Sequence, residues 1–185
     1  IQSSYLRNSI LQMHQSKKGF QENPKPVSDY ILHGRYQDQV KAQGFMPYMK
    51  PFYDLLEKYR GKMIYLDFWA PWCPPCLAEM EPLKELRKKY KTEDIVFITI
   101  CRGDNRKRLK EVLEKYEMHV DGIEHILTDD LQDDNNVHKM YNQLNVNRFP
   151  HYFIINREGV IVNYGSMMRP SYPGTAACIE QWLGK

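Results

Sequence analysis

One stretch of the sequence decides the fold: Met63-Ile-Tyr-Leu-Asp-Phe-Trp-Ala-Pro-Trp-Cys-Pro-Pro-Cys76. Its first part, Met63–Trp69, consists mostly of large apolar residues, a run that is typical of a buried β-strand. The run ends at Ala70-Pro71, and a helical pattern begins at Cys73. Two cysteines separated by two residues therefore stand where a strand changes into a helix. A pair of this kind beside a strand–helix–strand pattern indicates redox chemistry.

The position of the two cysteines predicts their roles. A thiol at a helix start ionises more easily, because free backbone N–H groups and the helix dipole favour the thiolate, which is the nucleophile. We therefore expect Cys73 to attack a disulfide, and Cys76, three residues later on the same helical face, to attack the mixed disulfide that forms. Pro74 and Pro75 suit the first helical turn, and they leave the N–H of Cys76 as the nearest donor to the Cys73 sulfur.

The alternative interpretation of the pair is half of a zinc site, or two inert core thiols. A zinc site normally draws further ligands from a second Cys pair or a His pair. Cys101 and Cys178 are isolated from each other in the sequence, so we expect no metal and no cofactor. Because free cysteine behaves as a core residue, we expect both to be buried free thiols; a disulfide between them stays open.

The motif resembles that of a known family. The segment from Asp67 to Cys76 resembles the thioredoxin signature, and the residues through Glu79 are similar to those of the TlpA/ResA-like thiol-disulfide oxidoreductases. Pro82 lies one position later than in the family's pattern. The family also has a cis-proline before a strand hairpin and a final helix, a layout matched by Phe149-Pro150 and the residues after them. The resemblance covers roughly residues 62–185 and implies a thioredoxin fold, an α/β architecture with a central mixed sheet flanked by helices.

The resemblance implies two residues that handle protons. Strand alternation places Asp67 on the face opposite Phe68, and in thioredoxin the matching Asp lies beneath the cysteines and handles the proton of the second thiol. Burial without a cation should raise its pKa. Glu79 matches a Glu that helps to set the thiol pKa values in the ResA-like group. Glu81 is its rival if the shifted Pro82 also shifts the register.

Three further residues are implied for substrate binding. The loop that holds Phe149 and Pro150 faces the cysteines in this family, and its backbone pairs with the substrate chain as a short added strand. Phe149 is bulkier than the residue often found there, so it could narrow the range of substrates. Trp72, together with Trp69, is expected to shield the thiol pair. His151 comes directly after this loop, and we expect it to be structural rather than catalytic.

Composition and pattern divide the chain. Its 185 residues, 42% of them hydrophobic, suffice for one full core, and a net charge of +3 gives no sign of nucleic-acid binding. We expect residues 1–46 to be an extension and linker, with a short amphipathic helix at residues 5–13, and residues 47–185 to be the thioredoxin-like domain. Because the chain begins with Ile1, we expect a processed product whose missing upstream segment could carry a membrane tether.

Periodicity predicts the other elements of the domain. The expected domain includes an extra strand and helix that thioredoxin lacks. The resemblance to the TlpA/ResA-like family, which has an insertion at this place, implies them. The acidic stretch at Asp133 is expected to cap a helix rather than to bind calcium. In chain order we expect a helix at 47–59, a helix from 73 to about 90 kinked at Pro82, a strand at 95–101, a helix at 106–116, a short strand at 125–127, a helix at 135–144, strands at 151–155 and 160–164, and a helix at 175–183.

These observations lead to one functional hypothesis with several rivals. The hypothesis is a thiol-disulfide oxidoreductase that uses its Cys-Pro-Pro-Cys pair to reduce disulfides of exported proteins, periplasmic or otherwise exported by analogy with the family. Its partners would be protein dithiols or disulfides and an unidentified redox partner. A dithiol oxidase or isomerase stays open, because the dipeptide between the cysteines tunes the potential. So does a binding module without turnover. A thiol peroxidase is disfavoured, because Ala70 stands where peroxiredoxins carry Thr.

Overall fold

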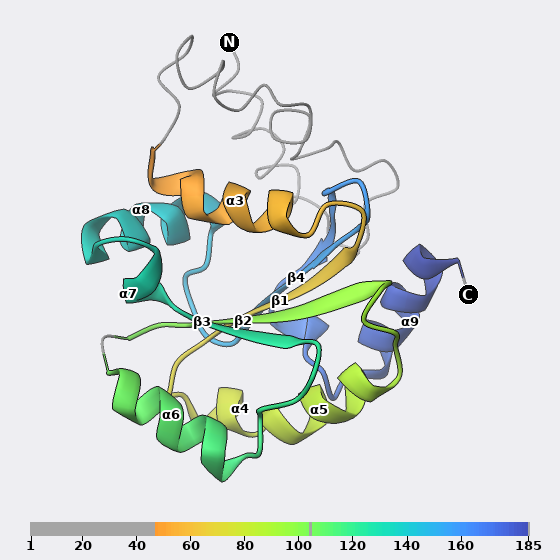
Figure 1. The fold of residues 1–185 in the computed structure, drawn as a ribbon, viewed down its shortest axis with the longest axis horizontal. Coiled ribbons are helices and arrows are strands. Elements are labelled where there is room, and N and C mark those ends of the chain that lie inside the picture. The colour runs from red at the N-terminus through yellow and green to blue at the C-terminus, as the bar shows by residue number, and fades with distance from the viewer. Residues whose placement is uncertain (1–46, 104, 185) are drawn as a thin grey trace, which may run out of the picture.

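The computed structural model describes residues 47–103 and 105–184, which build one sheet covered by helices on both faces (Figure 1). The five strands lie in the order β3-β2-β1-β4-β5. The first three run parallel, and the last two are antiparallel to each other, with β4 antiparallel to β1, so the sheet is mixed as predicted. The strands are β1 Met63–Trp69, β2 Ile95–Cys101, β3 Ile123–Leu127, β4 His151–Ile155 and β5 Ile161–Tyr164.

The helices form two layers, one on each face of the sheet (Figure 1). One layer holds α3 (Lys50–Lys58), α7 (Thr128–Leu131) and α8 (Asp134–Leu144). The other holds α4 (Pro74–Leu77), α5 (Met80–Lys88), α6 (Arg106–Lys115) and α9 (Pro173–Leu183). Two short 3-10 turns, Pro47–Met49 and Ser166–Met168, complete the described elements.

The alternation of side chains along β1 produces two separate cores. All residues of β1 and of β2 are buried, which explains why both strands are nearly continuous apolar runs in the sequence. Tyr65 and Trp69 pack on the side of α5 and α9, with the two motif cysteines. Leu66 and Phe68 pack on the other side, against α3 and α8. We call these the cysteine face and the α3 face of the sheet.

The helix after the cysteines differs from the prediction. The sequence predicts a single helix kinked at Pro82, but α4 ends at Leu77 and α5 begins at Met80. The reason is steric, because a proline ring within a helix clashes with the carbonyl of the residue four positions earlier, here Ala78. Pro82 itself lies in the first turn of α5, where its missing N–H costs little.

Side chains cap the N-termini of two helices, α6 and α8. Asn105 caps α6, since its side-chain oxygen accepts from the N–H of Arg108 at 2.9 Å. Asp133 caps α8, accepting from the N–H of Asn136 at 3.0 Å, so the acidic stretch does serve as a cap. The helix expected at residues 5–13 and the linker around residues 23–26 lie outside the described residues.

Candidate active site

The two motif cysteines lie at the end of β1 and form a disulfide. Cys73 is the N-terminal cap of α4 and Cys76 lies within it; their Cα atoms are 5.3 Å apart. Cys73 is 4% exposed and Cys76 is 2% exposed. The structure thus brings the pair together in the oxidised state, with both residues almost completely buried.

The Cys73 sulfur has the local donor that the sequence predicted. The backbone N–H of Cys76 donates to Sγ of Cys73 at 3.3 Å. Pro74 and Pro75, at the start of α4, have no N–H to offer. Since α4 ends at Leu77, this close N–H, rather than a long helix dipole, is the group placed to stabilise negative charge on the Cys73 sulfur.

Asp67 lies on the cysteine face of β1, opposite Phe68, as strand alternation predicted. It is 3% exposed, and its Oδ1 has no hydrogen-bond partner among the described residues. Burial raises the pKa of Asp67 well above its ordinary value, and the negative charge of Glu79 raises it further. A carboxylate with a raised pKa is a stronger base than an ordinary Asp, and such a group can accept a proton from a neighbouring thiol.

Two tyrosines that the sequence analysis overlooked surround this carboxyl. Tyr152 is the cross-strand neighbour of Asp67 on β4, and Tyr65 precedes it by two positions on the same face of β1. Tyr65 donates to the carbonyl of Met168 at 2.7 Å. Burial raises the pKa of both tyrosines, with Asp67 adding to the effect, so both hydroxyls stay neutral. Strand alternation was the signal that could have identified them.

Glu79 and Glu81 take different positions. The carboxylate of Glu79 accepts from the N–H of Ser171 at 2.9 Å and from its hydroxyl at 2.7 Å. Its negative charge contributes to the raised pKa of Asp67. Glu81 instead pairs with Lys84 at 2.6 Å on an exposed side of α5. The geometry therefore favours Glu79 over its rival.

The remaining cysteines are buried free thiols, as predicted. Cys101 ends β2, directly opposite Trp69, and Cys178 lies in α9. Burial raises the pKa of Cys101 to about 12 and that of Cys178 to about 11. At neutral pH both are protonated, so neither is an effective nucleophile.

Aromatic side chains connect the proline loop to the motif. The Phe149–Pro150 peptide bond is cis. The Phe149 ring lies 5.9 Å from that of Trp72 and 5.9 Å from that of Tyr141. Trp69 is fully buried, whereas Trp72 is 60% exposed and lines the same groove as Cys73.

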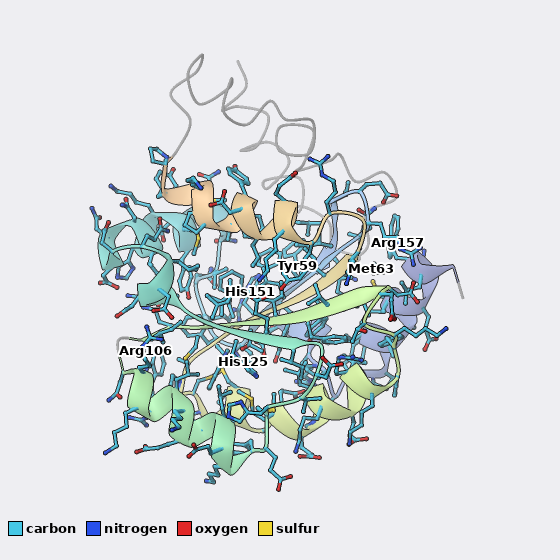
Figure 2. The ribbon with its side chains drawn as sticks, viewed as in Figure 1. Tyr59, Met63, Arg106, His125, His151 and Arg157 are labelled. Atoms are coloured by element: carbon cyan, nitrogen blue, oxygen red, sulfur yellow. A yellow bond between two sulfur atoms is a disulfide. The ribbon has the colours of Figure 1, made fainter. Side chains whose placement is uncertain are left out.

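His151 does not approach the cysteines. It is buried on the α3 face of the sheet (Figure 2). Its ring packs on those of Phe153 and Tyr164. The structural interpretation of this histidine is therefore correct.

A groove of about 550 Å³ opens beside Cys73. Three of its lining residues, Trp72, Cys73 and Phe149, were identified from the sequence. The other lining residues, which follow β2, lie in α8 or precede Phe149, were not. No local pattern could have indicated them, because they meet only in the folded chain. The groove is lined by Trp72, Cys73, Arg102, His138, Tyr141, Asn142, Val146, Asn147, Arg148 and Phe149.

The described part of the chain contains neither a cluster of metal-binding side chains nor a helix that could span a membrane. Within residues 47–103 and 105–184, no group of three or more His, Cys, Asp or Glu side chains is arranged to hold a metal ion. No helix described there combines the length and the apolar character that crossing a membrane requires.

Comparisons with known proteins bear on both the fold and the site. A family model described as Redoxin matches residues 52–174. Thiol-disulfide oxidoreductase ResA from Geobacillus kaustophilus is 29% identical over 106 residues, which are 57% of this chain and 55% of that protein. The chain thus spans about half the length of the curated relatives it matches.

Solved structures with a similar fold include thiol-disulfide oxidoreductases. The thioredoxin domain of a thiol-disulfide oxidoreductase from Bacteroides vulgatus superposes with a TM-score of 0.56 at 19% identity, covering 67% of this chain and 84% of that one. A second Bacteroides vulgatus protein, assigned as a thiol-disulfide oxidoreductase, is 32% identical with a TM-score of 0.55, covering 70% and 78%. The predicted thioredoxin fold is confirmed.

Proposed function

The chain belongs to the redoxin family, as a TlpA/ResA-like member of the thioredoxin superfamily, and on that premise we propose that it exchanges disulfides through Cys73 and Cys76. One observation carries the proposal: the two cysteines form a disulfide at the end of β1, and a buried carboxyl of raised pKa, Asp67, lies on the same face of the sheet. A redox-active pair needs both a reversible bond and a group that manages the proton of the second thiol.

The first step joins enzyme and substrate. In the reduced enzyme, the Cys73 thiolate, stabilised by the N–H of Cys76, attacks one sulfur of a substrate disulfide. The substrate S–S bond breaks, a disulfide between Cys73 and the substrate forms, and the other substrate sulfur leaves and takes a proton from water.

The second step releases the substrate. Cys76 gives its proton to the Asp67 carboxylate, and the resulting thiolate attacks Sγ of Cys73. The mixed disulfide breaks, the second substrate sulfur leaves and is protonated, and the Cys73–Cys76 disulfide forms. Two electrons have then passed from the enzyme to the substrate. A dithiol partner must therefore reduce the Cys73–Cys76 disulfide before the next cycle. Glu79 supports this step by raising the pKa of Asp67, which makes the carboxylate a stronger base.

The substrate-binding role is assigned to the wall of the groove. Trp72, Phe149 and Pro150 would hold the substrate chain, since Trp72 and Phe149 line the groove beside Cys73 and the Pro150 loop adjoins them. A peptide bound along the loop backbone would gain main-chain hydrogen bonds as an added strand.

The setting of the reaction extends the proposal. The relatives named ResA support protein dithiols and disulfides as substrates, and we propose disulfides of exported proteins, a periplasmic or otherwise exported location, and a membrane tether upstream. We also propose that residues 47–185 are the catalytic domain and residues 1–46 an extension of it. The redoxin match to residues 52–174 supports this division.

An insulin-reduction assay tests the proposal. With dithiothreitol as reductant, the protein should accelerate the precipitation of insulin B chain, because it relays electrons through the pair. Cys73→Ser should abolish the acceleration, whereas Cys178→Ala, which removes a buried thiol outside the pair, should keep it. A wild-type protein that binds insulin but does not accelerate its reduction would instead be the binding module.

A trapping experiment tests the two roles. Cys76→Ser should accumulate a mixed disulfide with the substrate, because nothing resolves it, and Cys73→Ser should not. Equal trapping by both variants would contradict the assignment. Equilibration of the wild type with glutathione buffers then gives the potential, which distinguishes a reductase from an oxidase or isomerase.

A further inference from the structure

We propose that the groove beside Cys73 selects substrates that carry a carboxylate close to the reacting sulfur, with Arg148 and Arg102 as its specificity-determining residues. The inference rests on the proposed disulfide exchange and adds a substrate class to it. The carboxylate could belong to an acidic residue beside a peptide cysteine or to a small thiol acid. Both share the chemistry that the groove would recognise.

The place of the groove makes it a substrate subsite. Cys73 forms part of its wall, so a substrate sulfur in contact with Cys73 brings the neighbouring atoms of the substrate to this groove. Its volume of about 550 Å³ is in the range of small-molecule sites and large enough for several side chains. What lines the groove therefore decides which neighbours of the reacting sulfur are tolerated.

The charges of the lining residues have one sign. The charged residues among them are Arg102 and Arg148, and no lining residue in the described part of the chain is acidic. Asn142 and Asn147 add amide groups. Trp72, Tyr141 and Phe149 supply apolar area, as shown by their ring contacts. A ligand that fits this lining is an anion on a partly apolar carrier.

Arg148 is the exposed cation of the pair. It directly precedes Phe149 and has no ion-pair or hydrogen-bond partner for its side chain among residues 47–103 and 105–184. A guanidinium offers five donors in a planar fork that matches a carboxylate, so an incoming carboxylate meets a cation that need not give up a partner within this described part of the chain.

Arg102 is the fixed cation. Its Nη2 donates to Asp134 at 2.6 Å and lies 3.1 Å from Nε2 of His138, and its guanidinium lies over the Tyr141 ring at 5.6 Å. The side chain is only 18% exposed, so its position is set by packing. Asp134 offsets part of its charge, but this carboxylate is 72% exposed and water screens it. Arg102 therefore contributes a positive field from a fixed position.

Matched substrates test the inference. Two disulfide-linked peptides would differ only in Glu or Gln beside the cysteine, and a second pair would be the disulfides of a small thiol acid and of its amide. We expect wild-type kcat/KM to favour the acid about three- to tenfold at low salt in at least one pair, with the preference falling as salt is added. The pair that shows the preference identifies the source of the carboxylate.

Variants connect the preference to the groove. Arg148→Gln should bring the acid-to-amide ratio toward one, and Arg148→Glu should invert it, because the sign of the charge is reversed. The matched control is Lys91→Gln, which removes an exposed cation that does not line the groove and lies before β2, at the other end of the sheet. Its ratio should equal that of wild type. Ratios are compared because they cancel any general loss of activity or folding.

The outcomes are separable. Equal turnover of acid and amide in both pairs would overturn the inference and leave disulfide exchange intact. A preference that survives in Arg148→Glu would also overturn it. Failure to turn over any of the four substrates would refute the proposed function instead.

Discussion

Leu66 and Asp67 are neighbours in β1, both almost completely buried, and their side chains enter opposite faces of the same sheet. Leu66 packs among apolar groups of the α3 face, between the strands that carry Ile98 and Phe153. Asp67 lies on the cysteine face, where it is flanked by Tyr152 on β4. Within the described residues, one strand thus supplies a core without a buried carboxyl group on one side and a reactive environment on the other.

The comparison of the two faces shows that stability and chemistry depend on opposite sides of β1. On the cysteine face, Oδ1 of Asp67 and the hydroxyl of Tyr152 have no hydrogen-bond partner in the part of the chain described. Leaving a buried polar group unpaired costs about 1–3 kcal/mol. Among the residues that the structure describes, the α3 face carries no buried Asp or Glu and can offset that cost by close packing.

The largest effect should come from the α3 face. Leu66→Ala leaves a cavity in a core with 0% exposure, so we expect the free energy of unfolding to fall by about 2–5 kcal/mol. Denaturant unfolding measures it, and Leu66→Met, which nearly conserves volume, should cost less than about 1.5 kcal/mol. At temperatures where both variants remain folded, the pH dependence of turnover should match wild type. A changed pH profile would mean that the two faces are not separate.

The next effect concerns turnover and comes from the cysteine face. Asp67→Asn removes the base that accepts the Cys76 proton, so resolution of the mixed disulfide should slow on the order of 100-fold at neutral pH. Rapid-quench analysis of the mixed disulfide measures this step. If the resolution rate is unchanged, the proposed role of Asp67 is wrong.

The same variant should change stability in a pH-dependent way. Below the ordinary Asp pKa of 3.8, the carboxyl is protonated in both the folded and the unfolded chain. As pH rises, the unfolded chain loses this proton first, so wild-type stability falls until the raised pKa of folded Asp67 is passed. Asp67→Asn should therefore gain on wild type across this window, by at most about 1.4 kcal/mol per pH unit. Unfolding curves from pH 3 upward, with Asp121→Asn as an exposed carboxylate control, measure the gain; a loss across this window would contradict the raised pKa.

The smallest effect should come from Glu79. Glu79→Gln removes a charge that raises the pKa of Asp67, so the pH profile of resolution should move to lower pH, with less than about a tenfold change in rate at neutral pH. Ser171→Ala is the matched control, because it removes the hydroxyl contact but keeps the Glu79 charge. A shift in Ser171→Ala as large as in Glu79→Gln would assign the effect to positioning rather than to charge.

Local signals account for what could be predicted. The strand before the cysteines, the face of Asp67 and the caps at Asn105 and Asp133 depend on residues adjacent in sequence, where the period of a strand or the geometry of a helix end fixes the outcome. The break at Ala78 was also in principle readable from Pro82, because the clash of a proline acts four positions upstream.

The sequence by itself determined the strand, the Cys73–Cys76 pair and the face of the strand on which Asp67 lies, since these depend on periodicity and on the spacing of residues within one strand–helix unit. Only the tertiary structure decided that Ser171 contacts Glu79 and that Arg102, Tyr141 and Arg148 meet beside Cys73. These groups come from separate elements and are brought together by sheet pairing and helix packing. Such contacts depend on the summed burial of the whole chain, and no local pattern encodes them.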